Sequence, residues 1–287
     1  MSSSKVRGDG DSASVEARTQ SYRTSHSMLT ADFALHPVPI LADNYVWILE
    51  HHRDAWIIDP GEAGPVAQFC HSHRLKPKAI LLTHAHQDHW AGVEGLMRQY
   101  ELPLLGPHGM PPAIAHCIHQ RLSAGDSLYM AEQTWQVVAL PGHTAEHIGF
   151  YLPGAPGHLL SGDTLFSFGC GRAFYSSEQL FASLSWIKQL PSDTWIYPSH
   201  EYTAANWRFA HRVEPDNPHI LSFAERLPQI GPHQPSLPVQ LADELMRNPF
   251  LRCDHRTVQK AAELASRSSI NCDSDVFSAL RAWKNVF

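Results

Sequence analysis

The sequence lacks any apolar run long enough to cross a bilayer, which takes about 20 consecutive residues in a helix. Its apolar stretches are short pieces such as Ala79–Leu82. It also lacks the apolar segment of a secretory signal, and the acidic residues Asp9, Asp11 and Glu16 disfavour an organelle transit peptide. We therefore expect a cytoplasmic protein with no membrane partner.

An excess of positive charge is also missing. The formal net charge is -6 and the pI is about 6.4. No basic stripe or nucleic-acid motif is present, so we expect no nucleic-acid partner. An anionic ligand would need a local pocket of cationic side chains.

Paired cysteine motifs are absent as well. The five cysteines are odd in number and scattered, with no CxxC spacing. This usage is typical of unpaired thiols in a reducing cytosol rather than of a disulfide framework. They are Cys70, Cys117, Cys170, Cys253 and Cys272.

The composition and the predicted secondary structure change twice along the chain. Residues 1–30 are polar and Ser-rich, which predicts a disordered leader; Met28 is an alternative start. Residues 31–200 alternate short strand-like runs with amphipathic helices, which predicts a layered α/β catalytic domain. After residue 200 we expect helices and no further strands, and therefore a small helical substrate-binding domain over residues 201–287. The helices are expected at 204–213, 219–227, 241–247, 256–266 and 275–287.

Histidine is abundant, with 20 residues against 22 Lys plus Arg. Four potential metal ligands lie within six residues, directly after a predicted apolar strand: His84, His86, Asp88 and His89. A helix could not aim all four at one centre, because His84 and Asp88 would share a face that His86 and His89 do not. At the end of a strand, the following loop can gather them around a cation.

Three more candidate ligands follow later apolar runs: His143, Asp163 and His200. The total of five histidines and two aspartates exceeds what one tetrahedral zinc ion can use. The sequence therefore indicates two metal ions that share a bridging carboxylate.

These residues make the chain resemble the metallo-β-lactamase superfamily and, within it, the glyoxalase II (hydroxyacylglutathione hydrolase) family. The HxHxDH loop and the later His, Asp and His in that order carry the first resemblance. Six further motifs over residues 31–287 narrow it: Asp43-Asn44-Tyr45, Ile58-Asp59-Pro60-Gly61, Cys170-Gly171-Arg172, His200-Glu201-Tyr202-Thr203, Asn248-Pro249-Phe250-Leu251-Arg252 and Arg281-Ala282-Trp283-Lys284.

The resemblance implies an αββα sandwich followed by a small α-helical C-terminal domain. It assigns the ligands of two divalent ions, for which Zn²⁺ is the first expectation and iron or manganese are open alternatives. His84, His86 and His143 would hold the first ion, Asp88, His89 and His200 the second, and Asp163 would bridge them. Asp59 is expected to support the site rather than to bind metal.

The implied reaction is hydrolysis of S-(2-hydroxyacyl)glutathione thioesters, such as S-D-lactoylglutathione, in the second step of methylglyoxal detoxification. Asp88 and Asp163 would be catalytic. The glutathione thiolate is a good leaving group, with a conjugate acid of pKa about 8.5, so no Ser or Cys nucleophile and no dedicated acid are required.

By the same resemblance, Arg172, Tyr202, Arg281 and Lys284 would bind the substrate. The chain departs from the family pattern after Arg172. Family members usually continue with Phe-Glu-Gly or Tyr-Glu-Gly, whereas this chain continues with Ala173-Phe174-Tyr175-Ser176-Ser177. Phe174 lacks the hydroxyl that some members carry there, and whether Tyr175 replaces it is open.

Other interpretations remain. A single-iron persulfide dioxygenase-like enzyme or a lactonase would use the same superfamily loop. A non-catalytic metal-binding or RNA-processing scaffold is a third hypothesis, which the complete ligand set disfavours. We expect a monomer.

Overall fold

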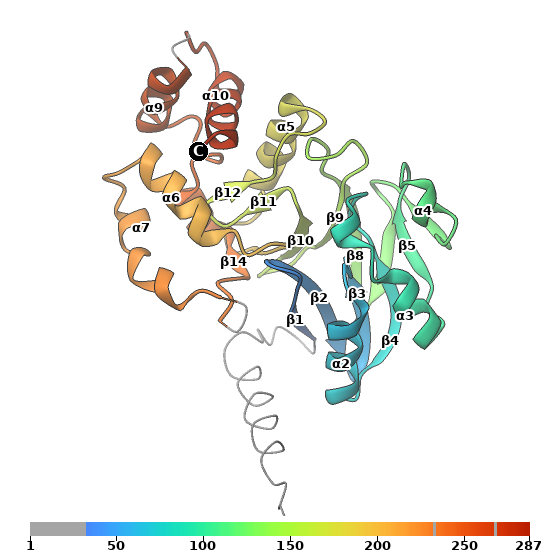
Figure 1. Cartoon of the computed structure of the whole chain (residues 1–287). Coiled ribbons are helices and arrows are strands. Elements are labelled where there is room, and N and C mark those ends of the chain that lie inside the picture. The colour runs from blue at the N-terminus through green and yellow to red at the C-terminus, as the bar shows by residue number, and fades with distance from the viewer. Residues whose placement is uncertain (1–32, 232–233, 267–268) are drawn as a thin grey trace, which may run out of the picture.

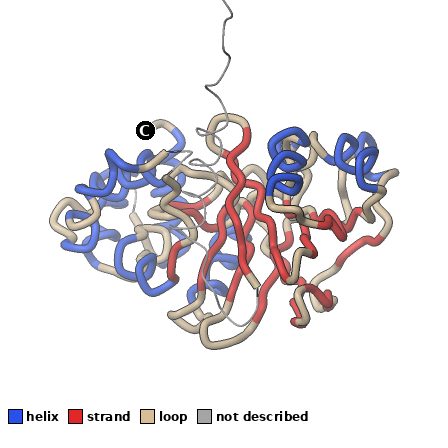
Figure 2. The backbone as a smooth tube through the Cα atoms, turned by 90° about the horizontal axis from the view of Figure 1, so that it is seen from below, coloured by secondary structure: helices blue, strands red, loops and turns tan. Residues whose placement is uncertain are grey.

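The computed structural model describes residues 33–231, 234–266 and 269–287, so the predicted leader lies outside the described residues. Two six-stranded sheets form the middle of the molecule, and helices lie on both sides of them (Figures 1 and 2). The first sheet has the order β1 (Ala34–Ile40), β2 (Asn44–His51), β3 (Asp54–Ile58), β4 (Lys76–Leu81), β5 (Leu104–Pro107), β6 (Gln120–Leu122). The second has the order β14 (Val239–Gln240), β13 (Trp195–Pro198), β10 (His158–Gly162), β9 (Ile148–Leu152), β8 (Gln133–Ala139), β7 (Ser127–Met130).

The side chains of β2 show why the sheets are layered. They alternate between two cores, as the period of a strand requires. Trp47 and Leu49 belong to the cluster between the sheets, whereas Val46 and Ile48 pack in a second cluster with Val66. A strand buried on both faces needs a layer on each side, and this produces the αββα sandwich. The helices of this part are α2 (Ala63–Ser72), α3 (Val93–Tyr100), α4 (Pro112–Ala115) and α5 (Ser177–Lys188).

The C-terminal part is helical, as predicted, and gathers at one end of the sandwich (Figure 1). None of the described helices is long and apolar enough to span a membrane. The helices are α6 (Thr203–Val213), α7 (Pro218–Leu221), α8 (Leu241–Arg247), α9 (Arg256–Ser266) and α10 (Asp273–Asn285), with a 3-10 turn, η2 (Ala224–Gln229).

Two expectations for this part were wrong. The helix expected over 219–227 is instead α7 followed by η2, which contains Pro228. A proline inside a helix removes a donor and clashes with the carbonyl four residues earlier, so a regular α-helix does not continue there. A strand also occurs after residue 200, because β14 pairs antiparallel with β13. β14 has only two residues, too few to show the alternating hydrophobic pattern of a strand. Their extended conformation depends on pairing with β13.

A small hairpin, β11 (Leu165–Phe166) and β12 (Gly169–Cys170), lies between the second sheet and the helical part, since β11 contacts β13 and β12 contacts α6. It was not expected from the sequence. It begins two residues after Asp163 and ends two residues before Arg172. The hairpin therefore separates a predicted metal ligand from a predicted substrate cation.

Candidate metal centre

Strand ends from both sheets supply the candidate ligands. His84 follows β4 of the first sheet, and His143, Asp163 and His200 follow β8, β10 and β13 of the second. Asp88 and His89 lie in a short 3-10 turn, η1 (Gln87–His89). The sheets meet here, since the backbone N–H of Tyr45 donates to the carbonyl of Ser199 at 2.7 Å.

The structure brings all seven predicted ligands into two adjoining groups. Within each group, ligand atoms lie within 4.8 Å of one another. Asp163 connects the groups, because its Oδ2 lies 3.4 Å from Nε2 of both His143 and His200. The groups are His84, His86, His143 and Asp163, and Asp88, His89 and His200; a third set, Asp59, His84 and His89, overlaps both.

Hydrogen bonds at Nδ1 orient four of the five imidazoles. The Thr83 hydroxyl donates to Asp59 at 2.6 Å and so accepts from His84 Nδ1, at 3.0 Å. His89 Nδ1 donates to the same Asp59 carboxylate at 3.1 Å. In its neutral form, which is the form that binds metal, each ring therefore carries its proton on Nδ1 and directs the lone pair of Nε2 into the centre.

His143 and His200 follow the same rule. His143 Nδ1 donates to the carbonyl of Arg172 at 2.9 Å. His200 Nδ1 donates to Asp43 at 2.8 Å. His86 differs, since its Nδ1 lies 2.9 Å from Nε2 of His143.

Three buried polar atoms at the centre have no hydrogen-bond partner within the described residues: Nε2 of His84, Nε2 of His89 and Oδ1 of Asp163. Leaving such atoms unpaired costs about 1–3 kcal/mol each, so proteins seldom do so without a reason. Imidazole nitrogens and carboxylate oxygens are ligands for zinc, iron and manganese. The residues present therefore fit divalent metal ions.

The charge of Asp163 suits a cation. Burial by itself would raise the pKa of this carboxyl, but the adjacent His200 and His89 hold the pKa well below its usual range. Burial and the neighbouring His89 and His147 keep the pKa of His84 well below 6.5, which leaves this ring neutral. The centre thus combines an ionised carboxylate with a neutral imidazole.

Asp59 is joined to the residues around the centre by hydrogen bonds. Its side chain is 2% exposed and accepts hydrogen bonds from the Thr83 N–H (2.8 Å) and hydroxyl, the Ser199 hydroxyl (3.3 Å) and His89. With its oxygens occupied by these donors, Asp59 holds the loop and the His89 tautomer.

Three supporting residues were not recognised as such from the sequence. Asn44 Nδ2 donates to Asp88 at 2.9 Å, and Asp43 orients His200. His147 Nε2 accepts the backbone N–H of Asp163 at 3.0 Å, and its ring stacks on His84 at 4.8 Å. The recurrence of histidine four residues after His143 was a signal that could have pointed to His147.

The predicted substrate cations lie near one another beside the centre. Burial, and then the charges of Arg281 and Arg172, lower the pKa of Lys284 from 10.5 to about 8. Within the described residues, no carboxylate forms an ion pair with Arg172 or Lys284. Tyr202 stacks on the ring of His200, with centroids 4.6 Å apart.

Arg281 is placed differently from the others. It is 5% exposed, and its Nη1 donates to the carbonyls of Cys170 (3.0 Å) and Gly171 (3.3 Å). Its Nη2 makes no hydrogen bond among the described residues. The guanidinium thus anchors the loop that leads to Arg172.

Phe174 covers one side of the centre. Its ring is 64% exposed and lies edge-on to His86 (5.5 Å) and His143 (5.4 Å). Tyr175 is 55% exposed, and its N–H donates to the carbonyl of Gly142. An apolar ring therefore stands where the family pattern led us to look for a hydroxyl.

Comparisons with known proteins divide the chain in two. Residues 41–200 match the model of the metallo-beta-lactamase superfamily, and residues 201–287 match the model described as hydroxyacylglutathione hydrolase C-terminus.

Individual proteins resemble the chain over most of its length. The hydroxyacylglutathione hydrolase of Chromohalobacter salexigens is 41% identical over 258 residues, covering 88% of this chain and 98% of that protein. The hydroxyacylglutathione hydrolase of Aeromonas salmonicida is 42% identical over 255 residues, covering 87% and 98%. Among solved structures, TTHA1623 in a di-iron-bound form has a TM-score of 0.56 and 26% identity, covering 75% of this chain and 99% of that one.

Proposed function

Because the chain belongs to the hydroxyacylglutathione hydrolase family of the metallo-β-lactamase superfamily, we propose that it hydrolyses S-(2-hydroxyacyl)glutathione thioesters, such as S-D-lactoylglutathione. The products are glutathione and a 2-hydroxy acid, and the reaction is the second step of methylglyoxal detoxification. The observation that carries the proposal is the pair of adjoining His/Asp groups, in a chain whose C-terminal part matches the hydrolase family. That C-terminal match disfavours the dioxygenase, lactonase and scaffold hypotheses.

We further propose that these groups hold two divalent ions, with Zn²⁺ as the first expectation and iron or manganese as alternatives. His84, His86 and His143 would hold one ion, Asp88, His89 and His200 the other, and Asp163 both. The two-metal arrangement is supported by the position of Asp163 between the groups and by the di-iron form of TTHA1623. The chemistry that such ions supply when bound is Lewis acidity, which lowers the pKa of water and stabilises negative charge on a carbonyl oxygen.

The two aspartates differ in their access to water. The side chain of Asp88 is 40% exposed, whereas that of Asp163 is 8% exposed. Asp88 is therefore the carboxylate that can accept a hydrogen bond from the attacking water and orient it. Burial alone would raise the pKa of Asp88, but the adjacent His89 and Asn44 hold it well below its usual range, so the carboxylate stays ionised. Asp163 contributes fixed negative charge from inside the centre.

Substrate recognition is proposed for Arg172, Tyr202, Arg281 and Lys284. Glutathione carries two carboxylates, and Arg172 and Lys284 have no carboxylate partner among the described residues. Arg281 keeps Nη2 for the substrate while its Nη1 holds the loop. Tyr202, beside His200, would place its hydroxyl at the edge of the centre.

Purified protein assayed in parallel for thioester hydrolysis, oxygen consumption and metal content tests the proposal. We expect hydrolysis of S-D-lactoylglutathione, about two equivalents of metal per chain, and no oxygen consumption with glutathione persulfide. Oxygen uptake with one equivalent of iron would instead establish the dioxygenase. Metal-loaded protein that hydrolyses no glutathione thioester would refute the proposed substrate.

We also propose that the protein is a cytoplasmic monomer without nucleic-acid or membrane partners. All five cysteines are free in the structure, which suits a reducing compartment. The net charge of -6 disfavours polyanionic partners. Light scattering after size exclusion measures the oligomeric state directly.

A further inference from the structure

The motif Asn248–Arg252 joins α8 to α9 and contributes none of the proposed metal ligands, yet it holds the hairpin β11–β12. The side chain of Asn248 is fully buried. Its Nδ2 donates to the carbonyls of Phe166 at 3.1 Å and Gly169 at 3.0 Å, one on each strand of the hairpin. Its Oδ1 accepts the N–H of Phe250 at 3.1 Å.

A buried side chain of α8 also binds the hairpin. Glu244 is fully buried and accepts the N–H of Phe168 at 2.7 Å and the hydroxyl of Ser167 at 3.2 Å, both in the turn of the hairpin. It also lies 3.0 Å from Asn248 Nδ2, whose two hydrogens are shared among three acceptors, and it forms an ion pair with Arg247 at 2.9 Å. The turn of the hairpin, and the strand residue on each side of that turn, are therefore fixed by α8 and its C-terminus.

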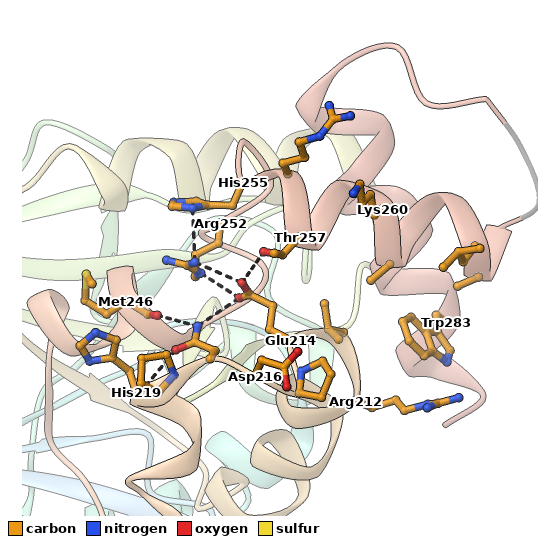
Figure 3. Close-up of a pocket in the computed structure, with 18 residues that line it drawn as sticks. Arg212, Glu214, Asp216, His219, Met246, Arg252, His255, Thr257, Lys260 and Trp283 are labelled. Atoms are coloured by element: carbon orange, nitrogen blue, oxygen red, sulfur yellow. Dashed lines mark hydrogen bonds and ion pairs between the residues drawn. The ribbon is translucent and has the colours of Figure 1, made fainter.

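The opposite end of the motif is fixed too (Figure 3). Arg252 makes two hydrogen bonds to Glu214, at 2.8 and 3.1 Å, and donates to the carbonyl of Leu245 at 3.2 Å. Thr257 at the start of α9 donates to Glu214 at 2.7 Å. Because Arg252 and Glu214 are both buried, the loop has little freedom to move away from the hairpin.

The residues that directly follow the hairpin contact the metal centre. The N–H of Gly171 donates to the carbonyl of Thr164 at 3.2 Å. A Cβ at Gly171 would lie 2.0 Å from the carbonyl oxygen of Asp163 and 3.1 Å from Nδ1 of His143. The backbone at Gly171 is therefore in close contact with the backbone at Asp163. The next residue, Arg172, offers the carbonyl that fixes the tautomer of His143.

We infer that Asn248 is a positioning residue for the metal centre: by clamping both strands of the hairpin, it sets the places of Asp163 and of the Arg172 carbonyl. The inference rests on the proposed metal-dependent function. It makes the helical domain part of the scaffold of the metal centre as well as a binding surface for substrate. It also accounts for a motif that the substrate cations leave unexplained.

The decisive comparison is between two Asn→Asp variants of the helical domain. Asn248→Asp keeps the acceptor for Phe250 and removes the donors to Phe166 and Gly169. Asn217→Asp is the control for the same substitution at a partly exposed position, because its Oδ1 accepts the N–H of His219 and its Nδ2 donates to the carbonyl of Met246, with no hydrogen bond to the hairpin. Each variant also places a carboxylate beside a glutamate, Glu244 or Glu214.

Zinc affinity, measured by chelator competition on folded protein, is the first readout, and kcat for S-D-lactoylglutathione is the second. Changes in residues that orient metal ligands typically cost about 10–100-fold in affinity. We expect Asn248→Asp to weaken zinc binding at least about tenfold and to lower kcat, and Asn217→Asp to change both less than about threefold. Equal losses of affinity in the two variants would overturn the inference, because they would show only a general loss of stability.

If Asn248→Asp does not fold, Asn206→Asp takes its place. Asn206 Nδ2 donates to the carbonyl of Ser167 in the hairpin turn at 3.0 Å, and the same difference from Asn217→Asp is expected. Wild-type protein that binds zinc but hydrolyses no glutathione thioester would refute the proposed substrate while leaving the affinity comparison valid. The two failures are thus distinguishable.

Discussion

At the residue scale, the centre depends on how each imidazole is held as well as on which residues are present. Four histidines form a hydrogen bond through Nδ1, and the acceptors are Thr83, Asp59, the Arg172 carbonyl and Asp43. The lone pairs of Nε2 therefore point inward without any rotation of the rings. Such preorganisation reduces the conformational entropy lost on binding metal.

Asp163 lies between the two ligand groups, so its loss should affect both metal sites. We expect Asp163→Ala to carry less than one equivalent of metal in total, and His200→Ala to lose chiefly the second ion. Elemental analysis after gel filtration measures both. Two equivalents retained by Asp163→Ala would show that the carboxylate does not bridge.

Lys284 should make substrate binding sensitive to alkaline pH. Its pKa in the folded protein is lowered to about 8, so the charge is present below that pH and is lost above it. We expect KM for S-D-lactoylglutathione to rise several-fold between pH 7.5 and 9, with kcat little changed, because one pH unit above the pKa leaves about a tenth of the side chain charged.

Lys284→Arg is the matched control, since a guanidinium stays charged throughout this range. Its KM should be flat where that of the wild type rises, while titration of the substrate itself affects both proteins equally. The lowered pKa also means that the folded state binds fewer protons than the unfolded state between about pH 8 and 10.5. Lys284 therefore contributes a rise in stability with pH across that window.

At the element scale, α10 presents different groups on its buried face and at its edge. Val276, Phe277 and Leu280 pack in the core, and Arg281 continues this buried face. Lys284, three residues later, is only partly buried, with Nζ 5.1 Å from the ring centroid of Phe209. One helix thus stabilises the hairpin loop with one cation, Arg281, and carries the other, Lys284, which is proposed to bind the substrate.

Replacement of the two cations should therefore have different consequences. Lys284→Ala would remove the proposed contact with the glutathione moiety, which remains similar throughout the reaction, so we expect KM to rise about tenfold with kcat and metal content unchanged. Arg281→Ala also releases the carbonyls of Cys170 and Gly171, and we expect it to lower kcat as well. The double variant should have a KM raised about ten- to a hundredfold.

A small thioester without peptide carboxylates provides the control substrate. Lys284→Ala should hydrolyse it as fast as wild type does, whereas Arg281→Ala should be slower on both substrates. An unchanged KM of the double variant for the glutathione thioester would contradict the substrate-binding assignment.

At the scale of the whole molecule, the two matched regions share one hydrophobic core. The cluster that contains Trp47 and Phe150 of the sheets continues through Phe209, Phe250 and Phe277 of the helical part. Moreover, β14 from the helical part completes the second sheet. The boundary at residue 200 therefore separates two sequence regions that pack as one structure.

We accordingly expect residues 31–200 alone not to fold cooperatively, because truncation would expose this cluster and the edge of β13. The intact chain should unfold in a single thermal transition with a calorimetric enthalpy equal to the van't Hoff enthalpy. Calorimetry and near-UV circular dichroism of both proteins check this. Two separate transitions, or a truncated protein with native near-UV signals, would contradict the shared core.

The sequence by itself determined the features that have a local pattern. The short strand-like runs interspersed with amphipathic helices predicted a layered α/β fold, and the apolar strands before His84, His143, Asp163 and His200 predicted its candidate ligands, because such runs and strand ends are local properties. Only the tertiary structure decided the rest. The hairpin β11–β12 is held by Asn248, 79 residues beyond Gly169, and β14 is extended because β13 lies beside it. Such contacts leave no period in the chain, since the free energy that favours them comes from burial and hydrogen bonds between segments that meet only when the molecule folds.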